Sequence, residues 1–319
     1  MDDLDAVFED IDAEDIGEQI TRRRLLVGGA AIGGGSLLLG QDRETEPTPE
    51  DQLTSAETRL ATVATTLNEA DVADPNSSWN LQNKVEAGVN AVNQILSEDF
   101  PNDPKINQRL SALRTATEYY STLLTSLAAA DSLYISIGDS ELEVLNHTGQ
   151  LDYSPTSKLD TASFGQSIAQ LADAEKSPSE VTSEGRTLLP DQQAVLESLR
   201  TQREVFDRHI RAQQSFLDSA TTIEAGIRAY EQSRFDDAEA ILADAHETLL
   251  SDISGTDGDY QLSKMGLTLG QYSKVFSLRQ DGVAQVLEAS RESTSEEKRQ
   301  SAINSALNTF FEARNLIPR

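Results

Sequence analysis

Histidine, cysteine and serine are the side chains from which catalytic and metal sites are most often built. This chain has few histidines and no cysteine, and its many serines lie outside the known catalytic motifs. It contains no cysteine, which excludes disulfides, thiolate metal sites and cysteine nucleophiles. Its three histidines, His147, His209 and His246, are far apart in sequence, and no His-Glu-x-x-His zinc motif occurs. No serine lies in a Gly-x-Ser-x-Gly elbow. We therefore expect no catalytic residue, no metal or cofactor site and no enzyme activity.

Carboxylates are the most abundant groups that could do chemistry. The chain has 54 Asp and Glu residues against 26 Lys and Arg, so pairs at hydrolase-like spacing occur everywhere and carry no information by themselves. One cluster, residues 252–259, sets three acids among glycines and could hold a cation. It lacks the residue order of an EF-hand loop and its terminal Glu. A polar loop between helices is the expected structure there, and a cation site is the alternative.

The net charge of -28 sets limits on partners. Nucleic acids and anionic membrane surfaces attract basic proteins, so we expect neither as a direct partner. Arg200, Arg203, Arg208 and Arg211 form the only local basic concentration outside the N-terminal region. In so acidic a chain they are expected to pair with acids between helices. A docking patch for an acidic partner is the alternative.

The kind of acidity is itself informative. Of the 26 basic residues only seven are lysine. At molar salt the Debye length falls to about 3 Å, so a dense carboxylate surface hardly repels itself. The composition resembles that of proteins from halophilic archaea, which implies a folded acidic surface adapted to high salt. Disorder is the competing explanation, but regular apolar periodicity from Leu53 onward favours a folded chain.

The N-terminal region has the layout of a targeting segment. Residues 1–20 contain nine acids and no base, and residues 25–40 form an apolar, glycine-rich run. A motif at the start of the apolar run consists of Thr21, Arg22, Arg23, Leu25 and Leu26. It resembles a twin-arginine export signal, which implies that the chain crosses the membrane already folded. We expect residues 1–40 to be this signal or a membrane anchor.

Two outcomes of export stay open. A helix over the sixteen apolar residues would be about 24 Å long, shorter than the roughly 30 Å hydrocarbon core of a bilayer, and no clear cleavage site follows it. The protein is therefore expected either to face outward from the membrane or to be secreted. Asn76 and Asn146 begin Asn-x-Ser/Thr sequons and are candidate glycosylation sites.

The rest of the chain repeats apolar residues at intervals of three and four, the period of a helix that packs on a core. The first such stripe consists of Leu53, Ala56, Leu60, Val63 and Leu67. No comparable alternating stretches are present, apart from an ambiguous patch at residues 133–137. We expect an all-α protein of antiparallel helical hairpins, an α-solenoid-like bundle preceded by an N-terminal signal or anchor helix.

Composition shifts divide the chain further. An acidic, proline-containing linker is expected over 41–52, an N-terminal helical subdomain over 53–177 and a C-terminal helical subdomain over 183–319. Residues 138–160 are the least helical part and predict a loop with one short helix. After Pro190, about forty residues of sustained periodicity predict a long helical arm.

Aromatic residues offer little for a binding groove. The single tryptophan, Trp79, and the pair Tyr119 and Tyr120 are expected to pack in the core or at helix ends rather than to form a ligand cage.

Small and large apolar residues alternate in the last hundred residues at spacings typical of paired helices. These positions are Gly226, Phe235, Ala238, Leu242 and Ala245, followed by Ala306, Phe310, Ala313 and Pro318. They resemble degenerate tetratricopeptide repeats, which implies antiparallel helix pairs nested against small residues. Tyr272 stands where an intervening repeat would place a small residue. Generic helical-hairpin packing is therefore the alternative.

Together these features predict an exported, cell-surface-associated helical module of a halophile that binds protein partners at the cell envelope. The alternative is an extracytoplasmic protein that binds a ligand or a cation in a cleft between its two helical subdomains.

Overall fold

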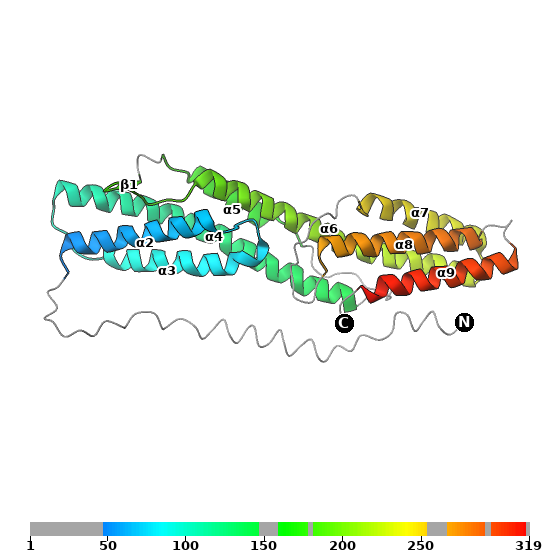
Figure 1. Ribbon diagram of the computed structural model, residues 1–319. Coiled ribbons are helices and arrows are strands. Elements are labelled where there is room, and N and C mark those ends of the chain that lie inside the picture. Colours follow the sequence, from blue (N-terminus) through cyan, green and yellow to red (C-terminus); the bar gives the residue numbers. More distant parts are fainter. Residues whose placement is uncertain (1–46, 147–158, 178–180, 254–266, 291–294, 317–319) are drawn as a thin grey trace, which may run out of the picture. The chain divides into compact units, whose positions relative to one another are not determined.

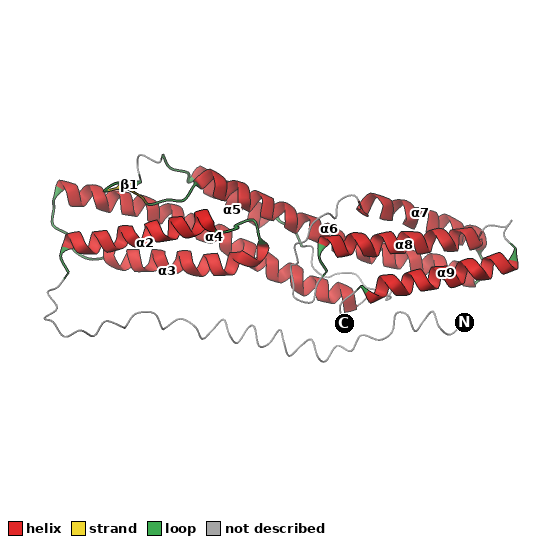
Figure 2. Cartoon of the chain, viewed as in Figure 1, coloured by secondary structure: helices red, strands yellow, loops and turns green. Residues whose placement is uncertain are grey.

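The structure is a computed structural model that describes residues 47–146, 159–177, 181–253, 267–290 and 295–316. These residues are almost entirely helical, with one very short two-stranded hairpin (Figures 1 and 2). The predicted all-α class is therefore confirmed. The described elements belong to one unit, Pro49–Arg319. The signal or anchor helix expected within residues 1–40 lies outside the described residues.

The described part of the chain consists of helices, one 3₁₀ helix and one short hairpin. In chain order they are α2 (Pro49–Glu69), the 3₁₀ helix η2 (Pro75–Ser77), α3 (Ser78–Leu96), α4 (Pro104–Asn146), α5 (Ala162–Asp173), β1 (Thr182–Ser183), β2 (Arg186–Thr187), α6 (Gln192–Glu231), α7 (Phe235–Ile253), α8 (Leu269–Ser290) and α9 (Glu296–Asn315).

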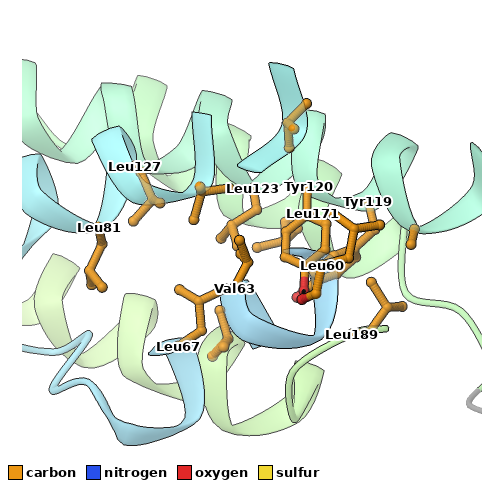
Figure 3. Close-up of a cluster of buried hydrophobic side chains, with 14 of the residues drawn as sticks. Leu60, Val63, Leu67, Leu81, Tyr119, Tyr120, Leu123, Leu127, Leu171 and Leu189 are labelled. Carbon is orange, nitrogen blue, oxygen red and sulfur yellow. Dashed lines mark hydrogen bonds between the residues drawn. The ribbon is translucent and has the colours of Figure 1, made fainter. Parts of the chain in front are cut away.

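One hydrophobic core lies between α2, α3, α4, α5 and the N-terminal part of α6; we call these elements the first bundle. Figure 3 shows its centre, where Leu60 and Val63 of α2 face Tyr120 and Leu123 of α4. The first predicted apolar stripe, on α2, is fully inside this core. Removing such side chains from water is the main force that holds the helices together.

A second core lies between the C-terminal part of α6 and helices α7, α8 and α9; we call these the second bundle. Here each helix packs on the next one in the chain, and α6 also contacts α8 (Figure 1). Tyr272 and Phe276 of α8 are fully buried at the centre of this core. Tyr272 therefore occupies a packing position as a large residue, where a tetratricopeptide repeat would have a small one.

Helix α6 belongs to both bundles. Its apolar side chains up to Ile210 pack in the first core, and those from Ala212 onward pack in the second. The division between the cores thus falls inside a continuous helix, not in the 177–183 segment where composition changes. The subdomain boundaries at 177 and 183 stay a prediction from composition. The two hydrophobic cores are separated at a different place, within α6.

The two longest helices compare differently with the expectation. The long arm after Pro190 is a 40-residue helix, as its periodicity predicts. In contrast, α4 continues through Gly138 to Asn146, where a loop with one short helix was expected. Ile137 and Gly138 are buried, and Gln213 of α6 donates a hydrogen bond to the Ile137 carbonyl at 3.0 Å. Packing against α6 thus outweighs the low helix propensity of glycine.

Candidate functional site

A buried ion pair joins α2 to α4. Glu57 has no exposed surface. Arg109 donates two hydrogen bonds to its carboxylate, from Nε to Oε1 at 2.7 Å and from Nη2 to Oε2 at 2.9 Å. Arg109 Nη2 also donates to the Thr54 hydroxyl at 2.9 Å. The hydrogen bonding to Glu57 raises the pKa of Arg109 above its ordinary value. This two-pronged geometry is the strongest form of a protein ion pair.

The β1–β2 hairpin closes over this pair. Ser183 donates its hydroxyl to Glu57 Oε1 at 2.6 Å, and Arg186 Nη1 lies 3.6 Å from Glu57 Oε2. The turn residue Glu184 lies 3.2 Å from Arg109 Nη1. Glu184 and Gly185 have φ values of 47° and 77°, the left-handed pair that a two-residue hairpin turn of this type requires. The Glu57 carboxylate thus holds α2, α4 and the hairpin together, and it is poorly placed to act as a base.

Sequence reasoning missed this network, although a signal existed. Glu57 falls within the apolar stripe of α2, between Ala56 and Leu60, and a charge in such a stripe is normally buried only when it is paired. Its partners lie 52 and 126 residues along the chain, at Arg109 and Ser183. Periodicity could have flagged the buried charge but could not have named its partners.

A groove of about 500 Å³ lies next to the network, between α2 and the segment that leads into α6. Its lining combines apolar side chains with two carboxylates, one lysine, amides and hydroxyls. The lining residues are Ala61, Ala64, Thr65, Asn68, Glu175, Lys176, Val181, Thr187, Leu189, Pro190, Asp191, Gln192 and Gln193. These residues come from both sides of the expected 177–183 boundary. The size is that of a small-molecule site.

Long-range hydrogen bonds hold the groove wall in place. Asn68 Oδ1 accepts from the Asp191 backbone N–H at 2.8 Å, and Gln192 exchanges two 3.0 Å hydrogen bonds with the backbone of Lys176. Gln193 donates to both carboxylate oxygens of Glu175, at 2.6 and 2.7 Å. The groove is therefore formed by folding itself and needs no ligand to shape it.

Tyr119 and Tyr120 lie beneath this region and are both fully buried, with ring centroids 5.7 Å apart (Figure 3). Tyr120 donates its hydroxyl to the Leu188 carbonyl at 2.9 Å. The Tyr119 hydroxyl has no hydrogen-bond partner among the described residues. Burial raises the pKa of both phenols above the ordinary value. They pack in the core, which is one of the two placements expected for them.

The second bundle contains its own buried cation. Arg279 of α8 donates from Nη1 to the Phe216 carbonyl at 2.8 Å and to the Ser219 hydroxyl at 2.9 Å. Its guanidinium carbon lies 3.9 Å from the centroid of the Phe216 ring. Burial lowers the pKa of Arg279 to about 10, so the group stays charged at neutral pH. The contacts join α8 to α6.

The repeat-like positions of α6 and α7 lie together. Gly226 faces Leu242 so closely that a Cβ atom at Gly226 would be 2.5 Å from Leu242 Cγ. Ala238 and Ala245 are buried in the same helix pair, and the Phe235 ring lies 5.4 Å from that of Tyr230, between centroids. These residues position helices and contact no groove or cavity described above.

The repeat-like positions near the carboxyl end lie on α9. Ala306 and Ala313 are buried, and Phe310 packs against Gly282 of α8, where a Cβ atom would be 2.5 Å from Phe310 Cε1. Pro318 lies outside the described residues. Both hairpins thus use a glycine facing a large side chain, a device that generic hairpins share with tetratricopeptide repeats. The repeat relationship stays a prediction.

Two of the four clustered arginines, Arg200 and Arg203, form ion pairs that the structure shows. Arg200 and Arg203 pair with Glu197 and Asp207, each within α6, so the expectation of ion pairs between helices is wrong for these two. Arg203 also contacts the start of α5, where its Nε donates at 3.0 Å to the hydroxyl of Thr161, the residue before the helix. Residues three or four apart on one helix are simply its nearest charged neighbours.

The remaining aromatic and histidine residues divide between core and surface. His209 is buried with its ring edge-on to Tyr272, whereas His246 is half-buried on α7. Trp79 is the second residue of α3 and is 49% exposed, so it lies at a helix end and outside the core.

Several expectations fall outside the described residues. They concern the export motif (Thr21, Arg22, Arg23, Leu25 and Leu26), the side chain of Asn146 and most of the acidic segment 252–259. Within the described part, no helix combines the length and apolarity needed to cross a bilayer. No group of three or more potential metal ligands gathers there either.

Comparison of the chain with known protein families, with curated proteins and with solved structures finds no match.

Proposed function

We propose that this chain is an exported, cell-surface-associated protein of a halophile that acts as a helical interaction module. The order of packing in the second bundle carries the proposal: α6, α7, α8 and α9 each lie against the next helix in the chain. Helices stacked in chain order create an extended face, which is the surface that helical-repeat proteins offer to protein partners. On α9, Phe311 is 50% exposed and supplies an aromatic side chain of the kind that anchors interfaces.

Export is tested by the twin-arginine motif itself. The variant Arg22→Lys/Arg23→Lys should leave the protein inside the cell. Arg24→Lys is the matched control, because Arg24 occupies the variable position of the motif and its replacement should allow normal export. Fractionation in high-salt medium, with mass spectrometry of the N-terminus, gives the readout. Equal export of both variants would contradict the proposed route.

The interaction is tested on the full chain by cross-linking in intact envelopes at high salt. Phe311→Ser should lower the yield of a specific cross-linked partner about tenfold, as expected for loss of an interface anchor worth 1–2 kcal/mol. Ile135→Ser is the control, since Ile135 is also 50% exposed but lies on α4 of the first bundle. Equal yields from the two variants would count against an interface on the second bundle.

A second candidate function is favoured by the groove beside α2. Its volume and its mixed apolar and polar lining suit a small organic ligand, in line with an extracytoplasmic binding protein. Glu175 and Asp191 on the rim outweigh the single Lys176, so a ligand with a cationic group fits best.

Thermal unfolding of the full chain separates this candidate from the first. A ligand bound only by the folded state raises the unfolding midpoint, by an amount that depends on its concentration. A set of amines and divalent cations should reveal a shift that Glu175→Gln removes and Asp173→Asn, outside the groove, preserves. A midpoint that responds only to ionic strength would leave the groove without a ligand.

A further inference from the structure

Folding ties the sequon Asn76-Ser77-Ser78 into hydrogen bonds on every residue. The Asn76 backbone N–H and the side-chain Nδ2 both donate to Asp74 Oδ1 at 3.0 Å. The side-chain Oδ1 of Asn76 accepts from the Tyr134 hydroxyl of α4 at 2.8 Å. Both ends of the acceptor amide are therefore held, one by its own turn and the other by a helix 58 residues along the chain.

Asn76 itself lies at the surface, whereas Ser78, the hydroxyl residue of the sequon, is buried. It is the first residue of α3, it is 1% exposed, and its Oγ accepts from Gln202 Nε2 of α6 at 2.6 Å. Between the two, Ser77 Oγ donates to two backbone carbonyls at 2.8 Å. The tripeptide runs from a 3₁₀ turn directly into a helix, so it is helical and not extended.

Glycan transfer makes demands that this geometry cannot meet. The asparagine Nδ2 attacks the anomeric carbon of a phosphate-linked donor, the bond from that carbon to the phosphate oxygen breaks, and one amide proton passes to a base. The enzyme must hold the asparagine amide and the hydroxyl two residues later at the same time. We propose that folding of the first bundle closes this sequon, so that Asn76 can accept a glycan only on a chain that has not yet folded.

Glycan occupancy at Asn76 then records whether folding came before modification. The closure depends only on the contacts of Asn76 and Ser78. Its consequence in the cell rests on the proposed function, because a chain exported in the folded state meets extracytoplasmic enzymes with Asn76 already closed. We expect the exported protein to carry no glycan at Asn76.

The closure is tested on purified full-length protein carrying Gln232→Asn and Arg234→Thr. These changes create a sequon in the exposed turn between α6 and α7. The protein is incubated with an oligosaccharyltransferase and its lipid-linked donor, beside the proteolytic peptide 60–84, which contains Asn76 without its fold. The peptide and the engineered turn should be glycosylated, and Asn76 in the folded chain should react about 100-fold more slowly, since it must wait for local opening.

Two results would overturn the closure: equal rates at Asn76 in the peptide and in the folded chain, or no reaction in the peptide. Glycopeptide mapping of the exported protein then tests the route separately. A glycan on Asn76 in cells, together with resistance of the purified folded chain, would mean that closure holds and export of a folded chain does not. Modification of the purified folded chain would refute closure whatever the route.

Discussion

Glu57 is a full negative charge placed in a core that excludes water, and the structure balances it with Arg109 and Arg186. Removing one partner of a buried pair leaves the other charge uncompensated, which typically destabilises the fold by about 3–5 kcal/mol. This is several times the contribution of an exposed ion pair to stability. We expect Glu57→Gln to lower the free energy of unfolding by about 3 kcal/mol. Glu184→Gln, which removes an exposed partner of Arg109, should cost less than about 1 kcal/mol.

Denaturant titration at fixed salt, followed by circular dichroism, measures both changes. The double variant Glu57→Met/Arg109→Met should lose less stability than Glu57→Gln, because apolar side chains of similar volume often replace a buried ion pair without loss of stability. Similar destabilisation by Glu57→Gln and Glu184→Gln would show that burial does not decide the energy of this network.

Tyr119 and Tyr120 provide a matched pair of adjacent, fully buried phenols that differ in hydrogen bonding. Tyr120→Phe leaves the buried Leu188 carbonyl without its donor and should lower the free energy of unfolding by about 1–3 kcal/mol. Tyr119→Phe removes a hydroxyl that has no partner in the described structure, so it should be neutral or slightly stabilising. Equal losses in denaturant titration would contradict this assignment.

The sequence could place both tyrosines in the core or at a helix end, because Tyr120 falls on the apolar period of α4 and Tyr119 is its neighbour. It could not distinguish them, because the acceptor for Tyr120 lies 68 residues away in the segment between β2 and α6. The same limit applied to Glu57, whose burial was readable from its neighbours while its partners were not. Partners distant in sequence are fixed by the fold as a whole.

The packing of α6 against α7 depends on a glycine, and this can be tested as a property of the helix pair. Gly226→Ala would gain helix propensity but would push a Cβ atom into Leu242, so we expect a net loss of about 1–3 kcal/mol from overpacking. Gly270→Ala, at an exposed position in the first turn of α8, should change stability by less than about 0.5 kcal/mol. A stabilising Gly226→Ala would mean that the helices are free to move apart.

Helix lengths show what periodicity can and cannot predict. The 40 residues of α6 follow from an unbroken apolar repeat, and the hydroxyls of Thr221 and Thr222, in its last third, donate to carbonyls one turn back. The last turns of α4 were missed because Gly138 is a poor helix former by itself. Contact with α6, through Gln213, supplies the stabilisation that local propensity lacks.

The net charge of -28 is a property of the whole molecule and predicts how its stability responds to salt. Repulsion among surface carboxylates is screened as the Debye length falls from about 30 Å at 0.01 M to 3 Å at 1 M. We expect the thermal midpoint to rise by about 10 °C over this range, equivalent to roughly 3 kcal/mol for a domain of this size. Differential scanning calorimetry in KCl measures the rise, and a flat midpoint would contradict the role of surface charge.

Because α6 belongs to both bundles, their unfolding should be coupled. Leu199 and Phe206 pack in the first core and Phe216 in the second, so loss of either core removes support from the same helix. Trp79 is the only tryptophan and lies on α3, and its emission therefore reports the first bundle alone. We expect its denaturant midpoint to coincide with that of the helical circular dichroism signal.

The sharper form of this prediction uses the second bundle to perturb the first. Gly226→Ala acts about four helix turns beyond the last apolar α6 residue of the first core, yet in a coupled molecule it should move the Trp79 midpoint as far as it moves the helical signal. If the helical signal instead lost part of its amplitude early while the Trp79 transition stayed in place, the bundles would unfold separately. In that case α6 would be a connecting arm between two independent bodies, and the break in cooperativity would fall within residues 209–213, where His209 contacts the second bundle and Gln213 the first.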